Sequence, residues 1–151
     1  MNLDNIFEAL ERIVKNLDGL ITASKKQMEI LLQADFSKLN EILLEQERWL
    51  LAIQNAEDDR NNEIDKLCKE YNLQLPSYRI GEFVQNFIKF IDNEKAEKLL
   101  NYSQAIKNKA LALTELNMKN FELIAASKNI IDETIKKIFS TKNSSIIDMR
   151  M

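Results

Sequence analysis

Residues 31 to 43 read LLQADFSKLNEIL, a short polar interruption between two long segments whose apolar residues recur in steps of three and four. That spacing places apolar side chains along one face of a helix. Asp35 is a favourable N-cap residue, so the second helix is expected to begin directly after it. Because a connection this short joins only adjacent, reversed helices, residues 4–33 and 36–71 are predicted to form an antiparallel hairpin.

Both arms of this hairpin carry features beyond apolar spacing. Gly19 lies within the first arm, where glycine weakens a helix by about 1 kcal/mol relative to alanine. The second arm carries a heptad-like stripe from Phe36 to Tyr71 that is polar in its middle, at Glu57 and Arg60. These two residues could pair along the helix, most simply as a solvated ion pair of small stabilising effect.

The remaining segments are separated by one strong break, NLQLPSYRIG at residues 72–81, where the proline disfavours helix in the preceding residue. A short helix is expected at residues 82–91, with Phe83, Phe87 and Ile91 directed inward. Asp92 or Asn93 is expected to cap a final helix that runs to about residue 139.

Few turn-forming residues are available, since the 151 residues include 2 glycines and 1 proline. The composition therefore predicts an all-α fold: an antiparallel hairpin of long helices plus a long C-terminal helix, in an elongated, coiled-coil-like bundle. Residues 1–139 are expected to form a single helical domain, and residues 140–151 a flexible tail.

The composition also excludes several classes of protein. The net charge of −3 argues against a nucleic-acid binder, and no window is apolar enough to predict membrane insertion. The N-terminus shows no signal-peptide pattern, and a single cysteine suits a reducing cytosol. There is no histidine and no glycine-rich phosphate loop, so we expect no metal, no nucleotide or other cofactor, and no enzymatic activity.

The final helix carries an apolar arc that is wider than one packing seam requires. Residues 116–127 read LNMKNFELIAAS, and two rows seven residues apart run through this stretch. The first row is expected to face inward, and the second to be at least partly exposed until a partner covers it. The first row comprises Asn117, Ile124, Ile131 and Ile138, and the second comprises Leu116, Leu123 and Ile130.

Asn117 and Asn120 give this helix two amides on or beside its apolar face. One interpretation is that they fix helix register, as single buried asparagines do in coiled coils. The other is that their amides contact an incoming helix, because an asparagine buried without a partner costs roughly 1–3 kcal/mol. Both interpretations use the same chemistry, and the sequence leaves them open.

Three features together resemble the FlgN family of flagellar export chaperones. They are the break at Asp35 followed by a long helix with AEDDR, the segment Leu116 to Ile124 in a long final helix, and an acidic, histidine-free helical chain of this length. The resemblance implies a cytoplasmic bacterial chaperone that binds C-terminal helical segments of hook-associated proteins and delivers them to the flagellar type III export apparatus. It implies client binding through Leu113, Leu116, Asn117, Asn120, Leu123, Ile124, Ser127, Ile130 and Ile131.

Two alternatives remain beside this interpretation. A self-associating structural coiled coil would use the extra apolar row as its own oligomer seam. A related chaperone of the same apparatus would take a filament or filament-cap client instead. The sequence does not fix the oligomeric state, although a monomer with exposed apolar rows favours a chaperone.

Overall fold

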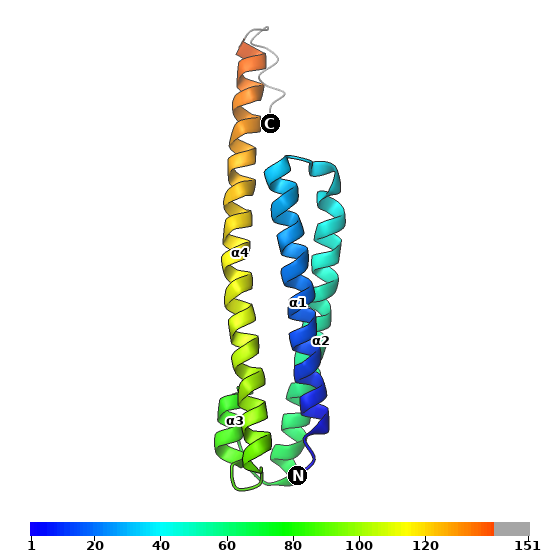
Figure 1. The fold of residues 1–151 in the computed structure, drawn as a ribbon, viewed down its shortest axis with the longest axis vertical. Helices are drawn as coiled ribbons and strands as arrows, with labels where there is room; N and C mark the ends of the chain where they lie inside the picture. The colour runs from blue at the N-terminus through cyan, green and yellow to red at the C-terminus, as the bar shows by residue number, and fades with distance from the viewer. Residues whose placement is uncertain (141–151) are drawn as a thin grey trace.

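The computed structural model describes residues 1–140, which form helices and no strand, so the predicted all-α fold is confirmed (Figure 1). The predicted tail at residues 140–151 lies, apart from its first residue, outside this described part. The elements are α1 (Asp4–Gln33), the short 3-10 helix η1 (Phe36–Lys38), α2 (Leu39–Glu70), α3 (Ile80–Phe87) and α4 (Asn93–Ser140).

The predicted antiparallel hairpin is formed by α1 and α2 (Figure 1). Its turn depends on Ala34, which adopts the left-handed conformation with φ 54° and donates its N–H to the Leu31 carbonyl. Asp35 precedes the 3-10 helix rather than α2, which begins only at Leu39, and its side chain makes no capping hydrogen bond to either helix. The Asp35 carboxylate accepts instead from the Ser37 hydroxyl over 2.6 Å, and this hydrogen bond lowers its pKa. The expectation of a direct N-cap at Asp35 was therefore wrong.

The three long helices form an open layer with α1 in the middle. Helix α1 packs along both α2 and α4, whereas α2 and α4 hardly contact each other. Helix α4 has 48 residues against 30 in α1, and it continues past the turn of the hairpin (Figure 1). A three-helix layer of this kind leaves the space between its two outer helices open unless something else covers it.

The densest part of the core lies at the other end, where α3 closes the layer. Phe83 and Phe87 of α3 are fully buried and stack with ring centroids 4.6 Å apart. Tyr71, just after α2, meets the Phe87 ring edge-on at 5.8 Å. The expected inward positions of Phe83, Phe87 and Ile91 are confirmed, although α3 starts two residues earlier than expected and ends before Ile91.

Two further local expectations are borne out. Residues 71–79 are non-helical around Pro76, as the proline predicted. Asp92 caps α4, since its Oδ1 accepts the Lys95 N–H over 2.8 Å. The short helix and its flanking turns thereby return the chain antiparallel to α2 and alongside α1.

Gly19 in α1 has a packing role that its sequence position did not disclose. A Cβ placed on Gly19 would lie 2.5 Å from Cε2 of the Trp49 ring on α2. Real Cβ atoms do not approach other heavy atoms this closely, so the absence of a side chain is what lets the indole lie against the α1 backbone.

Candidate functional site

A groove runs between α2 and α4 near the turn of the hairpin, with α1 as its floor. Its hollow has a volume of about 250 Å³. The floor is made by α1, one wall by α2 and the other by α4. We call this the inter-helix groove. It is lined by Leu20, Ser24, Gln27, Gln46, Leu50, Leu113, Asn117, Asn120, Phe121 and Ile124.

The base of the inter-helix groove is a polar network that joins all three long helices. Asn120 is 3% exposed, and its Nδ2 donates to the Ser24 carbonyl oxygen over 2.9 Å and to Gln27 Oε1 over 3.1 Å. From the opposite wall, Gln46 Nε2 donates to Gln27 Oε1 over 2.8 Å and to the Ser24 hydroxyl over 3.2 Å. Such shared acceptors fix the relative register of the three helices.

One atom of this network lacks a partner. Asn120 Oδ1 is buried and accepts no hydrogen bond from any group in the described part of the chain. A buried polar atom left in this state costs roughly 1–3 kcal/mol. Native proteins pair nearly all such atoms, so Asn120 Oδ1 is an exception at the base of the groove.

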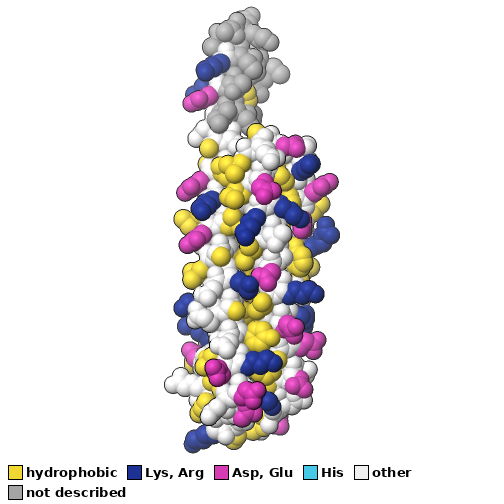
Figure 2. All heavy atoms as spheres, viewed as in Figure 1, with side chains coloured by type: hydrophobic (Ala, Val, Ile, Leu, Met, Phe, Trp, Pro, Cys, Tyr) yellow, Lys and Arg dark blue, Asp and Glu magenta, His cyan; other side chains and the backbone are white. Residues whose placement is uncertain are grey.

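The rim of the groove is apolar and open to solvent. Phe121 and Ile124 on α4 are 71% and 42% exposed, and Leu50 across the groove on α2 is 54% exposed. Figure 2 shows one face of the molecule, on which hydrophobic side chains alternate with charged ones along the length of the bundle. Large exposed apolar side chains grouped around a hollow are characteristic of interaction surfaces.

The groove brings together part of the expected client-binding set. Leu113, Asn117, Asn120 and Ile124 line it. Leu116, Leu123 and Ser127 are half-buried and lie outside the lining. The side chains of Ile130 and Ile131 lie outside the described part of the structure.

The expected orientation of the two rows on α4 was wrong at the positions that the structure describes. Asn117 and Ile124 were expected to face inward, but both are exposed at the groove. The reason is that, of the two hairpin helices, α4 packs mainly on α1, so only a narrow strip centred near Asn120 is covered here. The second row was expected to be at least partly exposed, and its members Leu116 and Leu123 are half-buried, which agrees with that expectation.

Sequence reasoning missed the contributions of α1 and α2 to the groove. Ser24 and Gln27 occupy polar positions in a run of buried residues, between Leu20 and Leu31 at steps of three and four. Gln46 interrupts the stripe of α2 in the same way, and Leu50 of that stripe is exposed rather than packed. Polar residues at core spacing on all three helices were the signal that could have identified the network.

The described residues include neither a cluster of metal ligands nor a membrane-spanning helix. Among residues 1–140, no group of three or more His, Cys, Asp or Glu side chains is placed to hold a metal ion. Likewise, none of the described helices is both long and apolar enough to cross a membrane. The inter-helix groove, with its polar floor and apolar rim, is suited to non-covalent binding.

The fold and the groove together define an all-α protein with an open, apolar-rimmed groove between two of its long helices. The family model described as FlgN protein matches residues 1–147, and the chain therefore belongs to the FlgN family. That family consists of flagellar export chaperones, which bind flagellar proteins, are cytoplasmic in general and are not known as enzymes. No curated protein and no solved structure matches the chain.

Proposed function

We propose that this protein is a cytoplasmic export chaperone that binds the helical C-terminal segment of a hook-associated protein in the inter-helix groove. It then delivers that client to the flagellar type III export apparatus. Membership of the FlgN family supports the chaperone role, and the groove supplies a place for the client. The chaperone works by binding alone, without a cofactor, a nucleotide, nucleic acid or membrane insertion.

The observation that carries this proposal is the group of exposed apolar side chains, Phe121, Ile124 and Leu50, around an open groove with a polar floor. An amphipathic helix laid between α2 and α4 would cover Phe121, Ile124 and Leu50. It would also convert the open layer into a four-helix arrangement with a closed core.

The polar floor gives the groove selectivity. A wholly aliphatic groove would accept any exposed amphipathic helix, whereas buried amides penalise partners that leave them unsatisfied. Asn120 bonds α1, which fits the role of fixing helix register. Asn117, exposed on the same wall, is assigned to client contact.

Binding of labelled peptides tests the proposal. The probes are fluorescein-labelled C-terminal segments of the hook-associated proteins from the same bacterium, titrated by fluorescence anisotropy. Phe121→Asp and Ile124→Asp are each expected to weaken binding at least about tenfold, because the complex would bury an unpaired charge. Both side chains are exposed in the free protein, so its melting temperature should stay close to that of the parent.

Leu111→Asp is the matched control, since Leu111 is 58% exposed on the same helix. At 100° per residue it lies about 140° around α4 from Ile124, away from the groove. The control should bind like the parent. Parental affinity in the Phe121→Asp and Ile124→Asp variants would contradict the groove as the client site. A stable oligomer of the parent, measured by sedimentation and dissolved by those same changes, would support the self-associating alternative.

A further inference from the structure

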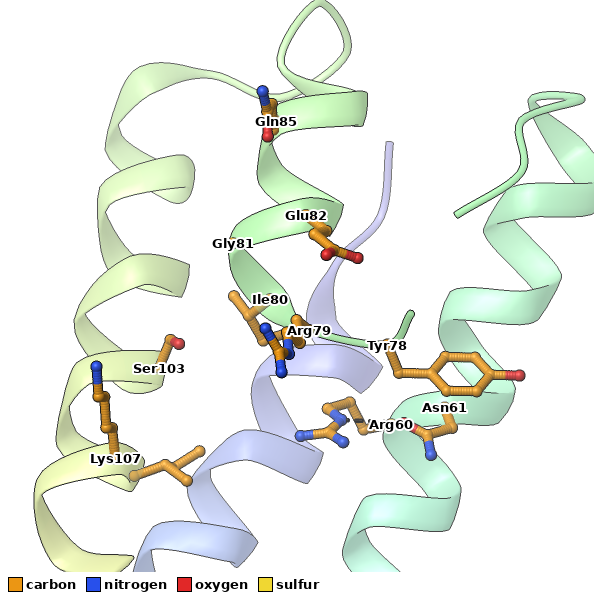
Figure 3. A pocket seen from close by; sticks show the side chains of 11 residues that line it. Arg60, Asn61, Tyr78, Arg79, Ile80, Gly81, Glu82, Gln85, Ser103 and Lys107 are labelled. Atoms are coloured by element: carbon orange, nitrogen blue, oxygen red, sulfur yellow. Dashed lines mark hydrogen bonds between the residues drawn. The ribbon is translucent and has the colours of Figure 1, made fainter. Parts of the chain in front are cut away.

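A second, larger hollow lies at the α3 end of the molecule, bounded by α2, by the start of α3 and by α4 (Figure 3). Its volume is about 920 Å³. Three cationic side chains line it, Arg60 from α2, Arg79 from just before α3 and Lys107 from α4. In Figure 3 the guanidinium groups of Arg60 and Arg79 point toward the interior of this basic hollow, and Lys107 stands on its α4 wall.

These cations lack acidic partners. Among the side chains that the structure describes, no carboxylate forms an ion pair with Arg60, Arg79 or Lys107. The only carboxylate in the lining, Glu82, accepts a hydrogen bond from the Ser77 hydroxyl over 2.6 Å. With three cations against one carboxylate, the lining of the basic hollow carries an excess of positive charge.

Arg60 is the most informative of the three. Its Nε donates to the amide oxygen of Asn61 over 3.2 Å, and the expected ion pair with Glu57 is not formed. Burial lowers the pKa of Arg60, and the nearby Glu57 charge only partly offsets that effect. A half-buried guanidinium without a carboxylate is costly, and a bound anion would remove the cost.

The walls of the basic hollow are suited to a peptide rather than to a single small ion. Half-buried Ile106 and the small exposed part of Ile80 add apolar surface to its lining. A Cβ on Gly81 would meet no atom within 4 Å, so the first turn of α3 is open to an approaching chain. The three cations come from three separate elements, which favours several spaced carboxylates over one phosphate group.

We propose that the basic hollow binds an acidic peptide segment of a partner protein, in which at least two carboxylates flank an apolar side chain. Carboxylates pair with Arg60 and Arg79, and the apolar side chain lies against Ile80 and Ile106. This site is separate from the inter-helix groove, and the proposal does not rest on the proposed function. A chaperone with both sites would hold two segments at opposite ends of the hairpin.

The test uses a short fluorescein-labelled peptide in which pairs of Glu alternate with pairs of Leu, titrated into the full-length protein by anisotropy. Arg60→Gln and Arg79→Gln are each expected to weaken binding about fivefold or more, and higher salt should weaken the parent complex. Lys89→Gln is the matched control, because Lys89 is exposed near the same end but does not line the basic hollow. It should bind like the parent.

Four outcomes of this titration would overturn the proposal. One is equal binding by the parent and both arginine variants, and another is absence of binding. A third is equal affinity for an analogue with Gln in place of every Glu, which would show that the carboxylates play no part. A fourth is displacement of the peptide by low millimolar inorganic phosphate, which would identify a site for free anions. Client capture through the groove is measured separately, so its result is independent of all these outcomes.

Discussion

The side-chain amide of Asn120 on α4 donates a hydrogen bond to the backbone carbonyl of Ser24 on α1, 2.9 Å away. This contact joins residues 96 positions apart and fixes the height of α4 against the hairpin. It lies where burial is otherwise sparse, because the dense core is at the α3 end. The placement of the α4 wall of the inter-helix groove therefore depends on a polar contact rather than on aliphatic packing.

Asn120→Asp and Asn120→Leu should have different effects. The carboxylate has no donor and would face the Ser24 carbonyl and Gln27 Oε1, both acceptors, so Asn120→Asp should destabilise the fold by about 2–4 kcal/mol. Asn120→Leu removes the unpartnered Oδ1 together with the donor and should change stability by less than about 1.5 kcal/mol. Urea unfolding measures both changes. Equal destabilisation by the two variants would contradict the network described here.

Gly19→Ala should destabilise the hairpin although alanine is the better helix former. The gain in helix propensity is about 1 kcal/mol, whereas a Cβ 2.5 Å from the Trp49 ring forces the indole to move, at a cost of about 1–3 kcal/mol. A lower urea midpoint is therefore expected. Replacing Trp49 with Leu in the Gly19→Ala background should make the added methyl group neutral or stabilising.

Gly81→Ala is the matched control for this prediction. A Cβ at Gly81 meets nothing within 4 Å and Gly81 does not have positive φ, so the change should be neutral or stabilising by up to about 1 kcal/mol. If Gly19→Ala and Gly81→Ala raise the urea midpoint equally, Trp49 does not restrict α1.

Local signals in the sequence were enough to predict the fold. The break near Asp35, the proline at residue 76 and the Asp92 cap each act over a few residues, and they determine where helices begin and end. Phe83 and Phe87 could be assigned to the core because a short helix has only one apolar face to bury.

The candidate site could be predicted only in part. A helical wheel orders Asn117, Asn120 and Ile124 around α4, but it does not say which neighbour lies beside each of them. That depends on α4 packing along α1 rather than along α2, which is a tertiary arrangement that a helical wheel does not contain. For the same reason, the spacing of Glu57 and Arg60 suggested an ion pair along α2. Arg60 instead lines the basic hollow, most of whose lining residues are distant from it in sequence.

Truncation of two phenylalanines should separate the core from the binding surface. Phe83 is fully buried against Phe87, so Phe83→Ala should destabilise the fold by about 3–5 kcal/mol. Phe121 is mostly exposed, and Phe121→Ala should change stability by no more than about 0.5 kcal/mol while weakening client binding. The two unfolding midpoints and the peptide titration measure these effects. A large stability loss in Phe121→Ala would show that the groove rim is part of the core.

Cys68 should react slowly with thiol reagents at neutral pH. Burial raises the pKa of its thiol, and the nearby Asp65 charge raises it further. Because the thiolate is the reactive form, a raised pKa means that less of it is present at any pH below the titration range. The rate with a disulfide reagent should therefore lie below that of an unstructured cysteine peptide and should rise at a more alkaline pH. Asp65→Asn removes the charge contribution but not the burial, so it should shift the profile partway toward that of the peptide. A profile that coincides with the peptide's in the folded parent would contradict the raised pKa.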